Sequence, residues 1–234
     1  MEAFELLSTL TKLNDRDLSQ LTADELMAET LELETARAEA VAGKEALQQN
    51  RQLRKFANLK ERGRIPEVYT PVTGSVIARS PTVWFSTVGI NRGSSDGVSV
   101  NDPVISGDGL VGRISSVSRG QSEVTLISDN SSAVTAKVVP NGAQGVVRPE
   151  IGEPGQLVLE FLDQTRKLGK GQSVVTSGWR GGDLSSFYPA GIPVGEVDRA
   201  PIDEREAIQS VELVPYADLR NLELLQVLTG GNRG

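Results

Sequence analysis

The sequence contains neither cysteine nor histidine among its 234 residues. Without cysteine there is no disulfide, no thiolate nucleophile and none of the usual structural zinc sites. Without histidine there is no imidazole to accept a serine proton near neutral pH, so a Ser-His-Asp triad is excluded. We therefore predict no catalytic, metal-binding or cofactor-binding residues, and a protein that is not an enzyme.

Positive charge and long apolar runs are also scarce. The net charge is −7 and no run of four basic residues occurs, which argues against a nucleic-acid partner. Apolar runs extend over only a few residues, far short of the ~20 needed to cross a bilayer, so this chain shows no signal peptide or membrane span.

Proline and glycine are unevenly distributed along the chain. All eleven prolines lie from Pro66 onward, and only Gly43 and Gly63 precede it among the glycines. The first 64 residues are instead rich in Ala, Leu, Glu and Arg, a composition typical of a long helix. We therefore expect the helix to stop near Gly63 and Pro66.

Thr22-Ala-Asp-Glu25 matches a capping box and predicts a helix start, with no proline before Arg62. Roughly 40 residues give a helix about 60 Å long. We assign 22–64 to a coiled-coil helix. Residues 1–21 are assigned to a short amphipathic helix or arm whose role cannot be inferred.

Apolar residues recur every seven positions along this helix, at the spacing of a coiled-coil a position. The d positions carry no large apolar side chain; they are Glu29, Ala36, Gly43 and Asn50. A denser apolar patch near the helix end consists of Leu53, Phe56 and Leu59. We expect a homodimer that is weak without an anchor; the alternative is a monomeric helix folded back on the remaining chain. The predicted dimerisation residues are Leu26, Leu33, Ala40, Leu47, Leu53 and Phe56.

From Thr70 the pattern changes to short β-branched runs bounded by turn residues, without intervening helices, which favours barrels or sandwiches. The segment 100–114 resembles 169–197: each has a polar turn, an apolar strand, a glycine and a second strand with two glycines, Gly109-Leu-Val-Gly112 in one and Gly191-Ile-Pro-Val-Gly195 in the other. This repeat predicts two similar β subdomains. We assign 65–150 to the first barrel, 151–229 to the second, with strands free to exchange between them, and 230–234 to a tail.

Several short motifs in the β region together form a recognisable pattern. They are Gly93 with Asp96-Gly97-Val98, Asp102-Pro103-Val104-Ile105, Gly109-Leu110-Val111-Gly112-Arg113-Ile114, Ser128-Asp129, Thr176-Ser177-Gly178 and Pro189-Ala190-Gly191-Ile192-Pro193-Val194-Gly195. Together they resemble the rod shape-determining protein MreC family over about residues 45 to 228. The last two motifs are the most specific in order and spacing.

The resemblance implies a mainly β fold of two six-stranded, chymotrypsin-like barrels behind a coiled-coil helix. It also implies a bacterial inner-membrane protein whose β domain lies outside the cytoplasm, with the native membrane anchor expected but absent from this chain. Members dimerise through the helix and can assemble further. They scaffold the cell-elongation machinery together with MreB, MreD, RodA and a class B penicillin-binding protein whose activity they promote.

Three patterns that suggest chemistry have plainer interpretations. Gly107-Asp-Gly109-Leu-Val-Gly112 matches the dinucleotide fingerprint, but a strand-like segment follows, which favours a tight hairpin turn with glycines at positive φ. A Ser-Lys pair from Lys170 with Ser173 or Ser177 lacks a supporting pattern. Scattered carboxylates without aromatic sugar platforms do not predict glycoside hydrolysis.

The few aromatic residues are candidates for a partner-binding patch. Equally, such rings can plug barrel ends. The candidates are Trp84, Phe85, Trp179, Phe187 and Tyr188. The function predicted from the sequence is a scaffold that binds and activates peptidoglycan synthases; the alternatives are an atypical barrel hydrolase and a periplasmic adaptor of a transport complex.

Overall fold

The computed structural model describes residues 23–80, 87–150, 152, 155–161, 168–178, 180–181, 184–199 and 210–231. The chain divides into two compact units, Met1–Gln49 and Asn50–Gly234. The described part of the first unit is helical: α2 (Ala23–Glu61) covers 39 residues and continues into the second unit. The predicted long helix is thereby confirmed, whereas Thr22 and the predicted arm at 1–21 lie outside the described residues.

Helix α2 ends at the predicted glycine. The backbone N–H of Gly63 donates to the carbonyl of Lys60 and that of Arg64 to the carbonyl of Leu59, each at 3.0 Å. Gly63 has a φ of +64°. This is the Schellman arrangement, in which a residue in the left-handed region lets two amides bond carbonyls that the helix leaves free. Pro66 follows and cannot continue the helix.

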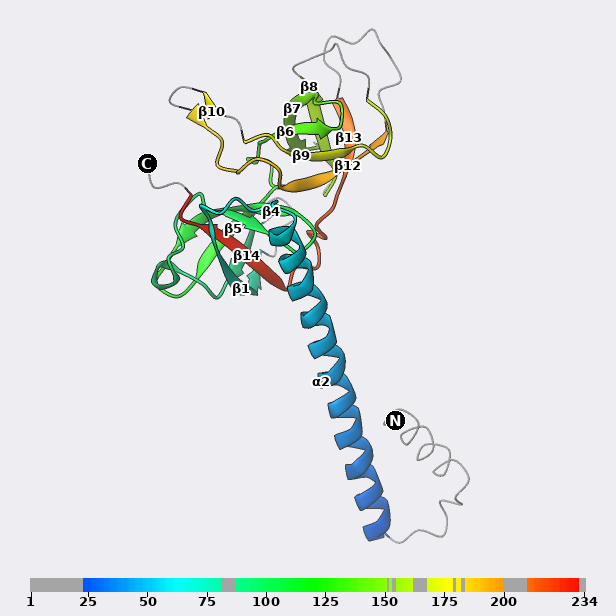
Figure 1. The fold of residues 1–234 in the computed structure, drawn as a ribbon. Helices are drawn as coiled ribbons and strands as arrows, with labels where there is room; N and C mark the ends of the chain where they lie inside the picture. Colours follow the sequence, from blue (N-terminus) through cyan, green and yellow to red (C-terminus); the bar gives the residue numbers. More distant parts are fainter. Residues whose placement is uncertain are drawn as a thin grey trace. The chain divides into compact units, whose positions relative to one another are not determined.

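The second unit contains two closed, antiparallel, six-stranded barrels (Figure 1). The first barrel closes in the order β1-β14-β3-β4-β5-β2. Its strands are β1 (Thr70–Arg79), β2 (Thr87–Ile90), β3 (Pro103–Ile105), β4 (Leu110–Val117), β5 (Ser122–Leu126) and β14 (Leu224–Thr229). A single 3-10 turn, η2 (Ser94–Asp96), follows β2.

The second barrel closes in the order β12-β13-β8-β7-β6-β9. Its strands are β6 (Val134–Val139), β7 (Gln144–Pro149), β8 (Leu157–Phe161), β9 (Ser173–Thr176), β12 (Pro193–Arg199) and β13 (Ser210–Pro215). In β6 alternate residues Val134, Ala136 and Val138 are buried, as expected for a strand with one face on a core. A small ribbon of β10 (Arg180–Gly181) and β11 (Leu184–Ser185) lies in the insertion before β12.

The predicted division at residue 150 differs from this arrangement. Strands β6 and β7 belong to the second barrel, and β14, assigned by sequence to the second, pairs with β1 and β3 in the first. In Figure 1 the red β14 lies beside β1, which is the first strand of the β region. Chain order does not determine this pairing, because a strand joins whichever open edge it reaches. The predicted exchange of strands between the barrels applies to β14.

The turn at Gly107 is a hairpin, as predicted, but its glycines serve another purpose. Strands β3 and β4 pair antiparallel, and the Ser106 N–H donates to the Gly109 carbonyl at 2.8 Å. Neither Gly107 nor Gly109 has a positive φ. A Cβ on Gly107 would instead meet Lys55 of α2, and one on Gly109 would meet the carbonyl oxygen of Pro193 on β12. These glycines permit close approach of the helix and the second barrel.

The glycines shared by the internal repeat have a common role within the barrels. A Cβ on Gly112 would collide with the carbonyl oxygen of Thr125, and one on Gly195 would collide with that of Val214. Each carbonyl belongs to the neighbouring paired strand. The second glycine of each repeated segment thus marks a place where two strands of a barrel lie too close for a side chain.

We predict that Gly112→Ala lowers the free energy of unfolding by about 1–3 kcal/mol, because the new methyl group forces a strand of the first barrel to shift. The matched control is Gly120→Ala, where no atom lies within 4 Å of the added Cβ. Chemical denaturation of the three proteins measures the difference. Equal midpoints for Gly112→Ala and wild type would show that β4 and β5 are not this close.

Candidate partner-binding surfaces

The predicted helical seam is open to solvent where its side chains are described. Leu47 is 61% exposed and Leu53 51%, Ala40 is exposed, and Leu33 is half-buried. The side chain of Leu26 lies outside the described residues. Ala40 and Leu47, which are seven residues apart, and the neighbouring Leu53 are available to a second helix, so dimerisation through these residues stays a prediction.

Phe56 does not belong to that open seam, which corrects the prediction for this residue. It is only 3% exposed within the single chain and lies in the hydrophobic core together with Leu59 and Ile65. Its ring therefore anchors the last turns of α2 to the barrels. A side chain already buried in this way has little apolar surface left to offer a second copy.

Two of the five aromatic candidates lie among the described residues, and they differ. Phe187 is 41% exposed, whereas Tyr188 is 4% exposed and part of the core. Tyr188 is thus corrected from a contact residue to a core residue, because the single chain already buries its ring. Trp84, Phe85 and Trp179 lie outside the described residues.

Arg113 of the first barrel holds Phe187 in place. Its guanidinium carbon lies 5.2 Å from the centre of the Phe187 ring, a cation–π distance. Arg113 Nη1 also donates to Asn101 Oδ1 at 2.5 Å, and Asn101 has a φ of +71°. Arg113, the arginine of the Gly-Leu-Val-Gly-Arg motif, belongs to the first barrel. It therefore supports the exposed Phe187 ring, which precedes β12 of the second barrel.

Burial also changes the chemistry of Tyr188. Desolvation raises the pKa of its phenol to about 12, with the nearby Arg113 charge acting in the opposite direction. The hydroxyl therefore stays protonated at any physiological pH, so Tyr188 cannot serve as a base there.

Thr176, the first residue of the Thr-Ser-Gly motif, has a structural role. Its buried hydroxyl donates to the Pro189 carbonyl at 2.5 Å and accepts from the Ile192 N–H at 2.9 Å. One side chain thus joins the two motifs that are most specific in the sequence. The Thr-Ser-Gly and Pro-x-Gly-Ile-Pro motifs fix the entry to β12 and place Phe187 just before it.

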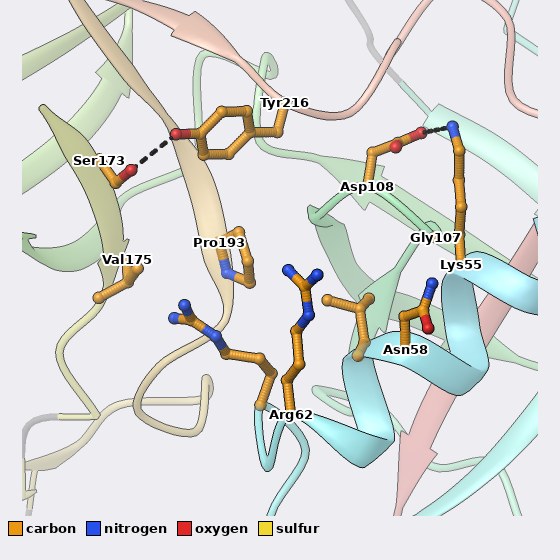
Figure 2. A pocket seen from close by; sticks show the side chains of 11 residues that line it. Lys55, Asn58, Arg62, Gly107, Asp108, Ser173, Val175, Pro193 and Tyr216 are labelled. Atoms are coloured by element: carbon orange, nitrogen blue, oxygen red, sulfur yellow. Dashed lines mark hydrogen bonds and ion pairs between the residues drawn. The ribbon is translucent and has the colours of Figure 1, made fainter. Parts of the chain in front are cut away.

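A cleft lies where the end of α2 meets both barrels (Figure 2). Its volume is about 330 Å³. Lys55 and Asp108 form an ion pair of 2.8 Å on one side, and the Ser173 and Tyr216 hydroxyls hydrogen-bond at 2.9 Å on the other. Figure 2 shows the Arg62 side chain extending from the helix end toward Pro193.

Sequence reasoning did not identify this cleft. The available signal was the charge distribution of the helix: residues 50–64 carry six basic side chains and one acidic one, whereas 23–49 carry seven acidic and two basic ones. A basic helix end beside acidic surroundings is typical of an anion-facing surface.

The Ser-Lys pair considered from the sequence is not assembled. Lys170 forms an ion pair with Asp198 at 3.0 Å, and the Ser173 hydroxyl is engaged by Tyr216. Among the described residues no group of three acidic, histidine or cysteine side chains is placed to hold a metal ion.

The profile of the family described as "Rod shape-determining protein MreC, barrel core" matches residues 76–229 of this chain. That range covers both closed barrels from β1 to β14. The chain belongs to the MreC family.

Curated MreC proteins agree with this assignment. The cell shape-determining protein MreC of Listeria monocytogenes is 35% identical over 163 residues, covering 68% of this chain and 54% of that protein. The MreC of Cereibacter sphaeroides is 36% identical over 165 residues, covering 70% of this chain and 51% of that protein. The chain thus spans about half the length of these MreC relatives.

Solved MreC structures share the fold. An MreC structure from Listeria is 32% identical, has a TM-score of 0.62 and covers 89% of this chain and 96% of that one. A complex between Penicillin-Binding Protein PBP2 and MreC from Helicobacter pylori matches with a TM-score of 0.50 and 19% identity, covering 68% of this chain and 99% of that one. At that identity the likeness establishes the fold.

Within the described part of this MreC-family chain, no helix combines the length and apolar character that a bilayer span requires.

We predict that the stability of the protein falls as the pH rises from about 10 to about 12, partly through Tyr188. The folded phenol, with its pKa raised to about 12 from 10.0, resists ionisation that the unfolded chain undergoes, so its contribution is complete below about pH 10 and lost across that window. Tyr188→Phe should lose less unfolding free energy over the same range. Denaturant titrations of both proteins test this; identical slopes would contradict it.

Proposed function

We propose that this chain is a non-enzymatic scaffold of the bacterial cell-elongation machinery. It would act on the outer side of the inner membrane, binding a class B penicillin-binding protein and promoting its synthase activity, with RodA, MreD and MreB as further partners. Family membership over both barrels carries the proposal. The H. pylori relative has been solved bound to a penicillin-binding protein, and another solved relative is described as a major periplasmic domain.

The barrel architecture supports binding through side chains. Because both barrels are closed, each barrel strand is paired on both sides, and a partner cannot be recruited by adding a strand to a barrel edge. Recognition then depends on side chains that face outward. Activation would follow from higher affinity for one conformation of the synthase, which shifts its population without chemistry by the scaffold.

Phe187 is the described residue best suited to a synthase contact. It is exposed, apolar and aromatic, and Arg113 restricts its ring from the opposite side. Partly ordered aromatic side chains are frequent hot spots because little rotamer entropy is lost on binding. We therefore keep Phe187 as the proposed contact, together with Trp84, Phe85 and Trp179 from the sequence.

We predict that Phe187→Ala weakens binding to the extracytoplasmic part of a class B penicillin-binding protein by about tenfold or more, since hot-spot truncations cost about 2 kcal/mol or more. Val139→Ala is the matched control, because Val139 is also 41% exposed and lies on the second barrel. Calorimetric titration of the three proteins measures the affinities. Equal affinities for Phe187→Ala and Val139→Ala would remove Phe187 from the interface, and no binding by wild type would refute the synthase partner.

We further propose that the helices pair in parallel and in register. With Leu33 and Ala40 at a positions, Glu32 and Glu39 take g positions, and Arg37 and Lys44 take e positions. In a parallel pair each g residue faces the e residue of the next heptad on the second copy, which joins Glu32 to Arg37 and Glu39 to Lys44. An antiparallel pair would instead place the glutamates opposite each other.

We predict that Glu39→Lys raises the dimer dissociation constant by roughly tenfold, because two attractive pairs of up to about 0.5 kcal/mol each become repulsive. Adding Lys44→Glu should restore the dimer by reversing both partners. Glu45→Lys makes the same charge change on the outer face of the helix and should have little effect. Sedimentation equilibrium measures all four proteins; a double variant as weak as the single one would contradict the parallel register.

A further inference from the structure

The last turns of α2 concentrate positive charge in a protein that is otherwise acidic. Residues 50–64 carry six of the 24 basic residues of the chain, against a net charge of −7 overall. Cations near a helix C-terminus are favoured by the helix dipole, which explains part of this enrichment. It does not explain why two of these arginines, Arg62 beyond the helix and Arg64 beyond its cap, line the cleft at the junction with both barrels.

Within the cleft the charges are not balanced by the protein itself. Lys55 is neutralised by Asp108 at 2.8 Å. Arg64 Nη1 donates to the Gly191 carbonyl at 3.3 Å, which carries no net charge. Among the described residues, the Arg62 side chain forms no ion pair or hydrogen bond. Neither guanidinium charge is therefore paired with a carboxylate of the described residues.

The walls of the cleft are held by packed elements. Leu59 on the helix side is 9% exposed and belongs to the core. Gly107 lies against Lys55, and Gly109 lies against the Pro193 carbonyl, so the hairpin, the helix and β12 meet without intervening side chains. The Ser173–Tyr216 hydrogen bond of 2.9 Å fixes the opposite wall. Such a cleft requires little reorganisation to receive a ligand.

The lining combines three kinds of recognition. Arg62 and Arg64 offer planar forks that match a carboxylate with two parallel hydrogen bonds. Val175 and Pro193 supply an apolar surface, and Asp108 supplies an acceptor beside them. A peptide presents the matching set, namely carboxylates, aliphatic stems and backbone N–H donors. At about 330 Å³ the cleft is at the small end of the range for ligand sites and has room for one or two side chains of a peptide.

We infer that this cleft binds an acidic segment of a partner polypeptide, whose carboxylates form ion pairs with the two arginines. The cleft is defined by Arg62, Arg64, Asp108, Ser173, Pro193 and Tyr216. A phosphate polymer is a poorer occupant, because it brings no N–H donor for the Asp108 carboxylate and no aliphatic stem for Val175 and Pro193. This contact lies beyond the proposed synthase surface at Phe187 and does not depend on it.

The test uses the whole chain and a fluorescent hexapeptide of glutamate, followed by anisotropy. We expect saturable binding that weakens with added salt, and no binding of the matched glutamine hexapeptide. Arg62→Gln with Arg64→Gln should reduce the affinity by about tenfold or more, because hydrogen bonds between charged groups are lost. Arg51→Gln with Arg54→Gln, on the same helix but outside the cleft lining, is the matched control and should keep the affinity.

The outcomes separate the explanations. Equal loss in both double variants would mean diffuse attraction to a basic helix and would overturn the cleft. Unchanged binding by Arg62→Gln with Arg64→Gln would overturn it as well. Displacement of the peptide by equimolar inorganic phosphate would show a phosphate site instead. Thermal melts identify a folding defect, and Arg62→Lys with Arg64→Lys, which keeps the charge, should then recover part of the affinity. Because no synthase is present, none of these results bears on the function proposed above.

Discussion

The burial of Phe56, Leu59 and Ile65 in one core with the barrels is the contact on which the rest of this architecture depends. It fixes the end of α2 against the β region, at a point where Gly107 and Gly109 leave no room for side chains. Burying a large apolar side chain contributes about 1.5–3 kcal/mol, so these residues form a substantial joint. The cleft keeps its shape because this joint holds the end of the helix against both barrels.

The parts of the fold that depend on local pattern could be predicted from the sequence. The proline-free stretch and Gly63 located the helix and its end, and the repeated segments with paired glycines indicated two similar barrels. The parts that depend on distant pairing could not. Nothing in Leu224–Thr229 indicates that this strand returns to β1 rather than joining the barrel nearest in sequence.

The same distinction applies to the candidate surfaces. Phe56 and Leu53 look alike in a helical pattern, yet one is 3% and the other 51% exposed, because only the barrels determine which face is covered. Phe187 and Tyr188 are adjacent and aromatic, and only the packing of the insertion separates an exposed ring from a core phenol. In the sequence Arg62 and Arg64 look like ordinary helix-end charges, and only the neighbouring barrels make them part of a cleft.

The rigid joint and the closed barrels, which face partners only with side chains, agree with the proposed scaffold, and pairing of the helices is part of the same proposal. The most direct test of the central claim is the mass, by light scattering, of the complex between this chain and the extracytoplasmic part of a class B penicillin-binding protein. A dimeric scaffold predicts, at high concentration, a complex with two copies of each protein that dissociates to one of each on dilution. A complex of one copy of each at every concentration, or no complex, would contradict the account.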